Sequence, residues 1–342
     1  MTPYHFALKV MRKLYGKAFG AFDPPIAPRE CDIDKCQDMI YGLLAAGKPC
    51  MVARFGAYEL NCVCNYLSIR SAKEGGVKVG RYIKGYGSDF WWNQSLMEHM
   101  QANAGFFPPT GEMLSRFCER MLRDAGEVDV LGSWLKEEYY VRAYLKEDVR
   151  RPTLLLLEPF FEKRPWTRVL AGRKVLVVHP FARLIERQYA EKRALLFKNP
   201  DVLPEFELKT VKAVQSLGGE SNGFNTWFDA LQWMEDEMDK TDYDICLIGC
   251  GAYGFPLAAH AKRSGKQAVH LGGSLQLLFG IKGKRWENPD HGAIRYGRKA
   301  PYLELFNEHW RYPEKEDVPK AATLVEGGCY WGGDSETVRK DL

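Results

Sequence analysis

Long apolar stretches are missing from this sequence. No uninterrupted apolar run approaches the ~18 residues that a membrane-spanning helix needs. Residues 1–20 also lack the apolar core of a secretory signal peptide. We therefore expect a cytoplasmic protein rather than one that spans a membrane.

Clusters of positive charge and paired metal-binding cysteines are missing as well. The net charge is only +4 and no Lys/Arg run appears, which argues against nucleic acid as a partner. Nine cysteines are present, but neither Cys31 and Cys36 nor Cys62 and Cys64 are followed by a second matching pair. This spacing predicts no zinc site, and it indicates small core residues in a reducing compartment.

Short apolar runs alternate with segments of helical spacing along most of the chain. The runs predicted as strands lie at 49–53, 128–132, 153–157, 174–178, 208–214, 245–248 and 267–271. Continuous apolar strands separated by helices are typical of a parallel sheet that is covered on both faces. We therefore predict an α/β, Rossmann-like fold with a mostly parallel sheet and helices on both faces.

Composition divides the chain into three parts. Residues 1–28 form a basic amphipathic segment and a Pro-rich linker, and residues 29–285 carry the alternating strands and helices. Residues 286–342 are rich in aromatics, proline and glycine without a clear period. We expect this last part to be an irregular tail that wraps the core rather than a second domain.

Three glycines follow the apolar strand at 245–248, and a helical segment begins after them. A strand that turns through glycines into a helix brings backbone N–H groups and a helix N-terminus towards a phosphate. We therefore place Gly249, Gly251, Tyr253 and Gly254 at a nucleotide-diphosphate site. A tight turn that needs small residues only for packing is the alternative.

The next predicted strand, 267–271, contains no acidic residue and runs into Gly272-Gly273-Ser274. A dinucleotide-binding unit places an Asp or Glu in this region to hold the ribose hydroxyls. Its absence argues against NAD as the ligand.

Charged residues follow the first predicted strand directly. Arg54 stands just past it, where a planar guanidinium can grip a phosphate with two hydrogen bonds. Glu59 falls in the first turn of the next helix, where its charge suits the helix dipole. A plain pairing of Arg54 with Glu59, or a helix cap, is the alternative.

Three further polar residues are candidates by position. His179 ends the strand at 174–178 and could act as a base or contact a phosphate, although a strand-end histidine can also be merely hydrogen-bonded. Glu158 closes the apolar run at 153–157 and is a candidate general base. Asn222, which precedes a predicted helix, is a candidate for binding the nucleotide ligand.

The first twenty residues carry four positive charges and no negative ones. Lys9, Arg12, Lys13 and Lys17 are interleaved with Phe, Leu, Met and Tyr. As a helix, this segment has a basic face beside an apolar one, which predicts weak association with the inner face of a membrane. A helix packed on the domain with its lysines in water is the alternative.

Arg54-Phe55-Gly56, followed by Glu59, resembles the Arg-Phe-Gly-Asp-Gly-Glu signature of the GT-D fold glycosyltransferases. The later part of the chain, up to residue 285, is also similar to that family. The resemblance implies a Rossmann-like domain that transfers a hexose from a nucleotide-sugar donor with inversion, with Phe55 and Gly56 beside Arg54 at the donor. The family's Asp-x-Glu pair is taken to hold a divalent metal. Here Ala57 replaces the Asp, and Glu59 alone makes a poor Mn²⁺ or Mg²⁺ site.

The expected function is therefore transfer of a hexose from a UDP-sugar to a surface polysaccharide or another glycan, free or lipid-linked. Inverting transfer needs a base for the acceptor hydroxyl and positive charge or N–H donors for the departing diphosphate. Glu59, Glu158 and His179 are the catalytic candidates. A non-catalytic sugar-nucleotide-binding protein, or a Rossmann-like enzyme that uses NAD or S-adenosylmethionine, are the alternatives.

Overall fold

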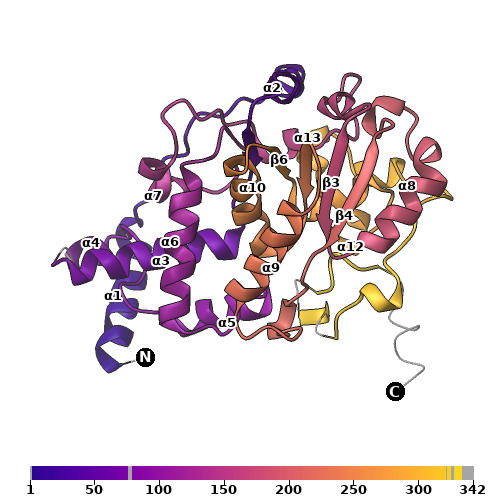
Figure 1. Cartoon of the computed structure of the whole chain (residues 1–342). Coiled ribbons are helices and arrows are strands. Elements are labelled where there is room, and N and C mark those ends of the chain that lie inside the picture. Colours follow the sequence, from indigo (N-terminus) through magenta and orange to yellow (C-terminus); the bar gives the residue numbers. More distant parts are fainter. Residues whose placement is uncertain (1, 76–78, 321, 325–326, 333–342) are drawn as a thin grey trace.

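The computed structural model of the chain describes residues 2–75, 79–320, 322–324 and 327–332 (Figure 1). Its six-stranded sheet is parallel throughout, in the order β2-β1-β6-β5-β3-β4. The strands are β1 (Cys50–Ala53), β2 (Val130–Leu131), β3 (Lys174–His179), β4 (Glu207–Lys212), β5 (Ile245–Ile248) and β6 (Gln267–His270). The predicted α/β fold with a parallel sheet is confirmed.

Helices cover both faces of this sheet because successive strand residues point to opposite sides. In β5, Cys246 and Ile248 pack with the helices at 111–125, 227–239 and 254–263, whereas Ile245 and Leu247 pack with those at 33–45 and 182–196. The helices are α1 (Pro3–Phe19), α2 (Ile33–Ala45), α3 (Ala57–Lys73), α4 (Val79–Ile83), α5 (Gln94–Ala102), α6 (Gly111–Ala125), α7 (Glu138–Val141), α8 (Ala182–Leu196), α9 (Trp227–Asp239), α10 (Gly254–Arg263), α11 (Leu275–Leu278), α12 (Lys284–Glu287) and α13 (Ala293–Tyr296). None of these described helices combines the length and apolar character needed to cross a membrane.

Polar side chains fix the start of several helices. The Asp32 carboxylate accepts a hydrogen bond of 3.0 Å from the Lys35 N–H at the start of α2. At the start of α9, Thr226 and Asp229 each accept a hydrogen bond from the other's backbone N–H. Such caps satisfy N–H groups that have no partner inside the helix, and each is worth ~1 kcal/mol.

The leucine run that was predicted as a strand at 153–157 is a short 3-10 helix, Leu154–Leu157. Leu156 and Leu157 are buried, so the run does belong to the core. Four apolar residues in a row indicate burial, but they do not distinguish a strand from a helical turn. The strand prediction is wrong, and Glu158 therefore does not follow a strand of the sheet.

Short 3-10 helices, turns and loops make up the described chain beyond α12, apart from α13. Its large aromatic side chains are inside the protein: Tyr302, Trp310 and Trp331 belong to the same buried cluster as α2 and α8. This is the irregular, aromatic-rich segment that the sequence predicts. The division of the chain at residues 28 and 285 remains a prediction.

Candidate functional site

A cavity of about 640 Å³ opens at the carboxyl ends of the strands. It lies where β5 and β3 are neighbours in the sheet but their following helices leave in opposite directions. After β5 the chain enters α10 on one face, and after β3 it enters α8 on the other. Such a switch point is the usual ligand site of an open α/β sheet, because the loops that leave it diverge.

The glycine turn forms part of the cavity wall. Each of its three positions favours glycine for its own physical reason. At Gly249, a Cβ would come within 2.6 Å of the Gly272 carbonyl oxygen. Gly251 has φ +58°, a conformation that favours glycine, and open space around it. At Gly254, a Cβ would meet the His270 ring. Gly249, Gly251 and Tyr253 line the cavity, whereas Gly254 lies behind it. Gly249 and Gly254 are thus needed for close packing, which is the alternative role considered for the turn from the sequence.

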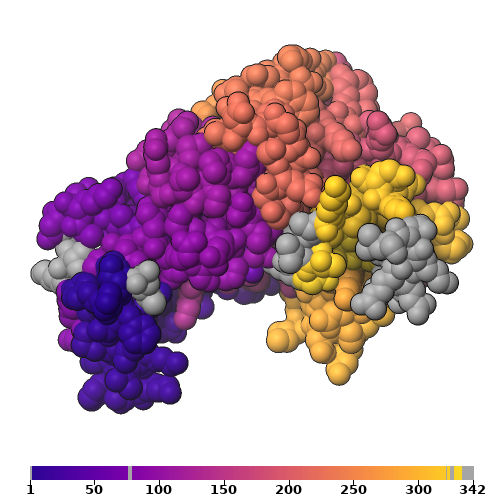
Figure 2. All heavy atoms as spheres, turned by 90° about the horizontal axis from the view of Figure 1, so that it is seen from below, coloured from indigo at the N-terminus to yellow at the C-terminus, as the bar shows by residue number. Residues whose placement is uncertain are grey.

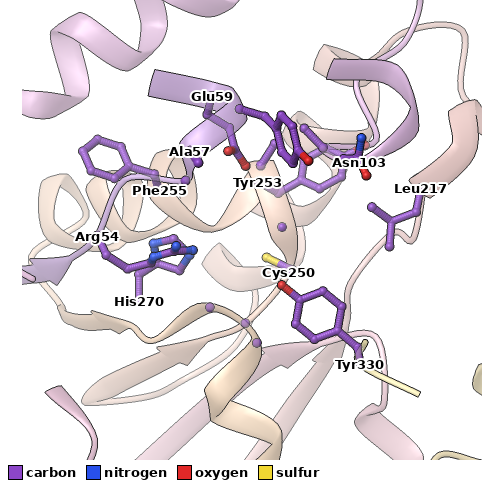
Figure 3. A pocket seen from close by; sticks show the side chains of 18 of the residues that line it. Arg54, Ala57, Glu59, Asn103, Leu217, Cys250, Tyr253, Phe255, His270 and Tyr330 are labelled. Atoms are coloured by element: carbon purple, nitrogen blue, oxygen red, sulfur yellow. The ribbon is translucent and has the colours of Figure 1, made fainter. Parts of the chain in front are cut away.

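Arg54 lines the cavity immediately after β1, beside His270 (Figure 3). Its guanidinium lies 5.2 Å from the centre of the Trp134 ring. On the other side it meets Gly272, where a Cβ would stand 3.2 Å from Nη1. These neighbours hold a half-buried arginine at the edge of the sheet where the sequence predicts it.

Glu59 lies in the first turn of α3 and is the only acidic residue among the described residues that line the cavity. Its carboxylate folds back over Gly56, where any Cβ would collide with it. Gly56 also lines the cavity, but Phe55 does not. Phe55 is buried and stacks on Phe255, with ring centres 4.6 Å apart, so it supports the wall from behind.

His179 lines the cavity from the end of β3, and its hydrogen bond determines its tautomer. The Phe181 N–H donates to His179 Nδ1 at 3.0 Å. Burial lowers the pKa of His179 to about 3, so the ring is neutral near pH 7. The proton of the neutral ring therefore sits on Nε2, and His179 is arranged to donate a hydrogen bond rather than to accept a proton.

His270, at the end of β6, is a cavity residue that the sequence interpretation missed. Burial first, and the positive charge of Arg54 second, lower its pKa to about 3, although the backbone of Arg54 acts in the opposite direction. Neither ring nitrogen has a hydrogen-bond partner of normal geometry among the described residues. Figure 3 shows the ring beside Arg54. Its position at a strand end was the signal that could have identified it.

Two further predicted site residues, Glu158 and Asn222, are also absent from the cavity lining. Glu158 is buried and accepts hydrogen bonds from Tyr302 Oη at 2.5 Å and Tyr296 Oη at 3.4 Å. Burial raises the pKa of Glu158 to about 7. Asn222 is exposed in a left-handed conformation, and its side-chain amide donates to the Gln215 carbonyl at 2.7 Å. The structure thus does not bring either residue together with Arg54 and Glu59.

The end of the chain contributes residues that no periodicity could have indicated. Arg285, Tyr330 and Trp331 all line the cavity. The Tyr330 ring lies against Gly273, where a Cβ would collide with it. The Arg285 guanidinium lies 4.6 Å from the centre of the Tyr330 ring. Arg54 and Arg285 therefore give the cavity two permanent positive charges against the single carboxylate of Glu59.

The residues present do not fit a divalent metal. Ala57 lines the cavity where the resembled family has an Asp, so the motif supplies only the Glu59 carboxylate. Within the described ranges, no group of three His, Cys, Asp or Glu side chains is arranged to hold a metal ion. Mg²⁺ and Mn²⁺ favour carboxylate oxygens, and Glu59 supplies the one carboxylate among the described residues that line the cavity.

Comparisons with known proteins give little beyond this description. No protein-family model matches the sequence, and a search of curated proteins finds no similar sequence. A solved structure described as a selenomethionine-substituted domain of unknown function 1792 aligns over 98% of both chains, with 12% identity and a TM-score of 0.41. Neither the fold nor the function of this chain is inferred from that likeness.

Proposed function

We propose that this protein binds a nucleoside diphosphate-sugar, with UDP as the nucleotide, and transfers the hexose to a glycan acceptor. One observation carries the proposal. Two arginines, one carboxylate and a strand–glycine–helix turn surround a single cavity at the switch point of a parallel sheet. Its volume falls within the ~300–1,000 Å³ range of small-molecule sites. The similarity of residues 54–60 to the GT-D signature supports the same class of substrate.

The diphosphate would be bound by positive charge and backbone N–H groups. Arg54 can hold phosphate oxygens in a bidentate manner, and Arg285 adds a second charge. The first N–H groups of the turn Gly251–Tyr253, which leads into α10, have no partner inside the helix and lie at its positive end. These donors replace the charge that a metal supplies in other transferases.

In the proposed transfer step, Glu59 acts as the base. Its carboxylate takes the proton from the acceptor hydroxyl while the hydroxyl oxygen forms a bond to the anomeric carbon of the hexose. The bond between that carbon and the diphosphate breaks, and its electron pair goes to the departing diphosphate. Arg54, Arg285 and the turn stabilise that charge as it develops, and His179 Nε2–H is a further donor. Attack from the face opposite the leaving group inverts the anomeric centre.

A non-catalytic sugar-nucleotide-binding protein is the second candidate. The observation that favours it is Ala57, which replaces an acid of the resembled motif. An enzyme that uses NAD or S-adenosylmethionine has less support, because no acid at the end of β6 is available for ribose hydroxyls. We expect the protein to work in the cytoplasm. Its expected acceptor is a glycan or a lipid-linked glycan.

A thermal-shift panel separates these candidates. UDP, UDP-hexoses, NAD and S-adenosylmethionine are added one at a time, since a ligand at 100 times its Kd stabilises the folded state by about 2.7 kcal/mol. We expect stabilisation by UDP and UDP-hexoses only. Release of UDP from a UDP-hexose then distinguishes an enzyme from a binding protein. Stabilisation by NAD or S-adenosylmethionine without UDP would contradict the proposal.

A further inference from the structure

One face of α1 holds the helix firmly on the body of the protein. Leu8 is 1% exposed, and the His5 ring stacks on Trp91 with ring centres 4.0 Å apart. Lys9 forms an ion pair of 3.0 Å with Asp89, and Arg12 donates to the Gly87 carbonyl at 2.9 Å. The helix is therefore a fixed part of the surface.

The opposite face of α1 is apolar and uncovered. Val10, Met11 and Leu14 are 39%, 43% and 61% exposed, and Tyr4 and Phe6 are more than half exposed. Single exposed apolar residues are ordinary, but three at positions i, i+1 and i+4 share one helix face and form a patch. Figure 2 shows α1 as a projection from the body of the protein.

Positive charge lies along the edge of this patch. A groove of about 620 Å³ between α1 and the segment 82–93 is lined by Lys9, Arg12, Lys13 and Lys17. Lys9 and Arg12 already have partners on the body. Among the described residues, no carboxylate lies within ion-pair distance of Lys13 or Lys17.

We propose that α1 docks this protein on an anionic membrane surface. The apolar face enters the boundary between headgroups and acyl chains, and Lys13 and Lys17 contact lipid phosphates. Charge decides between a membrane and a second copy of the chain, because a second α1 would bring the same positive charges and no acid. A bilayer with anionic lipid supplies both the apolar layer and the opposite charge.

A second projection reaches the same side of the molecule. In Figure 2 the segment 286–305 and α1 both extend towards the lower edge, and the outline is hollowed between them. Ile294 in that segment is fully exposed.

Docking by α1 does not depend on nucleotide-sugar binding. Only its purpose, to bring the cavity to a lipid-linked acceptor, rests on the proposed function.

Vesicle flotation of the full chain tests the proposal. The vesicles contain phosphatidylcholine alone or with phosphatidylserine, and the salt concentration is varied. One variant carries Met11→Ser and Leu14→Ser, and another carries Lys13→Glu and Lys17→Glu. Leu195→Ser with Lys198→Glu, on and just after α8, is the matched surface control, since both residues are exposed.

We expect the unmodified chain and the control to float with anionic vesicles at low salt, and to dissociate as salt rises. Each α1 variant should lower the partition coefficient about tenfold or more, while its melting temperature and UDP affinity stay unchanged. Equal recovery of all four proteins would overturn the proposal. So would dimerisation of the unmodified chain that the α1 variants abolish without any flotation. Because UDP affinity is measured on the same proteins, failure of docking and failure of the proposed function are distinguishable.

Discussion

At the scale of single residues, Glu59 is the group whose loss should affect chemistry most and binding least. It is the only acid among the described cavity residues, and a glutamine in its place keeps the shape but cannot accept a proton. We expect Glu59→Gln to lower turnover about 10²–10⁴-fold, the usual contribution of a general base, without weakening UDP binding.

Release of UDP from a UDP-hexose in the presence of acceptor measures this effect. Glu112→Gln is the matched control, because Glu112 occupies the first turn of α6 and does not line the cavity. Turnover by the Glu59 variant at the rate of the unmodified protein would remove Glu59 from the role of base.

The buried carboxyl group of Glu158 leads to a separate prediction about how the stability of the folded protein depends on pH. Its pKa is raised from an ordinary 4.5 to about 7 by burial, so the folded state holds this proton more tightly than the unfolded state. The stabilisation is fully present below pH 4.5 and is lost as pH rises through 7, by up to roughly 3 kcal/mol. Glu158→Gln has no such proton to lose. We therefore expect the melting temperature of the variant, relative to the unmodified protein, to rise between pH 5 and pH 8. A constant difference would contradict a buried, neutral Glu158.

At the scale of elements, the start of α10 depends on Gly254 for space rather than for conformation. An alanine Cβ there would meet the His270 ring, and overpacking of this kind costs about 1–3 kcal/mol. Gly42 in α2 is also helical, but nothing lies within 4 Å of its Cβ position. We expect Gly254→Ala to lower the free energy of unfolding and Gly42→Ala to raise it by about 0.5–1 kcal/mol. Denaturant unfolding measures both, and equal effects of the two variants would contradict the packing of His270 on α10.

The sequence could predict those elements whose signals are local. A short stretch of sequence is enough to predict Asp32 as an N-cap and the glycine turn after β5, and the structure shows both. The run at 153–157 was misassigned, because burial alone does not select a strand. Arg285 and Tyr330 reach the cavity only through the tertiary path of an aperiodic segment, so no local pattern could place them beside Gly273.

At the scale of the whole molecule, the balance of charge in the cavity predicts independence from divalent metal. Two arginines and the glycine turn line the cavity, while the motif offers one carboxylate where the resembled family has two. We expect donor binding and transfer to persist to a measurable extent in EDTA. Assays with EDTA, and with Mn²⁺ or Mg²⁺ added back, test this. Complete loss in EDTA that Mn²⁺ restores would mean that other ligands complete a metal site.

The central claim is that Arg54 binds the diphosphate of a nucleotide in this cavity, and calorimetric titration with UDP tests it most directly. Loss of one charge-assisted contact costs about 1.5–3 kcal/mol, so Arg54→Ala should weaken UDP binding about 10–150-fold. Arg187→Ala is the control, because Arg187 lies on α8 outside the cavity and pairs with Glu314. The account predicts UDP binding by the unmodified protein and the control, and a large loss only in the Arg54 variant. Equal UDP affinity in all three proteins, or no UDP binding by any, would contradict it.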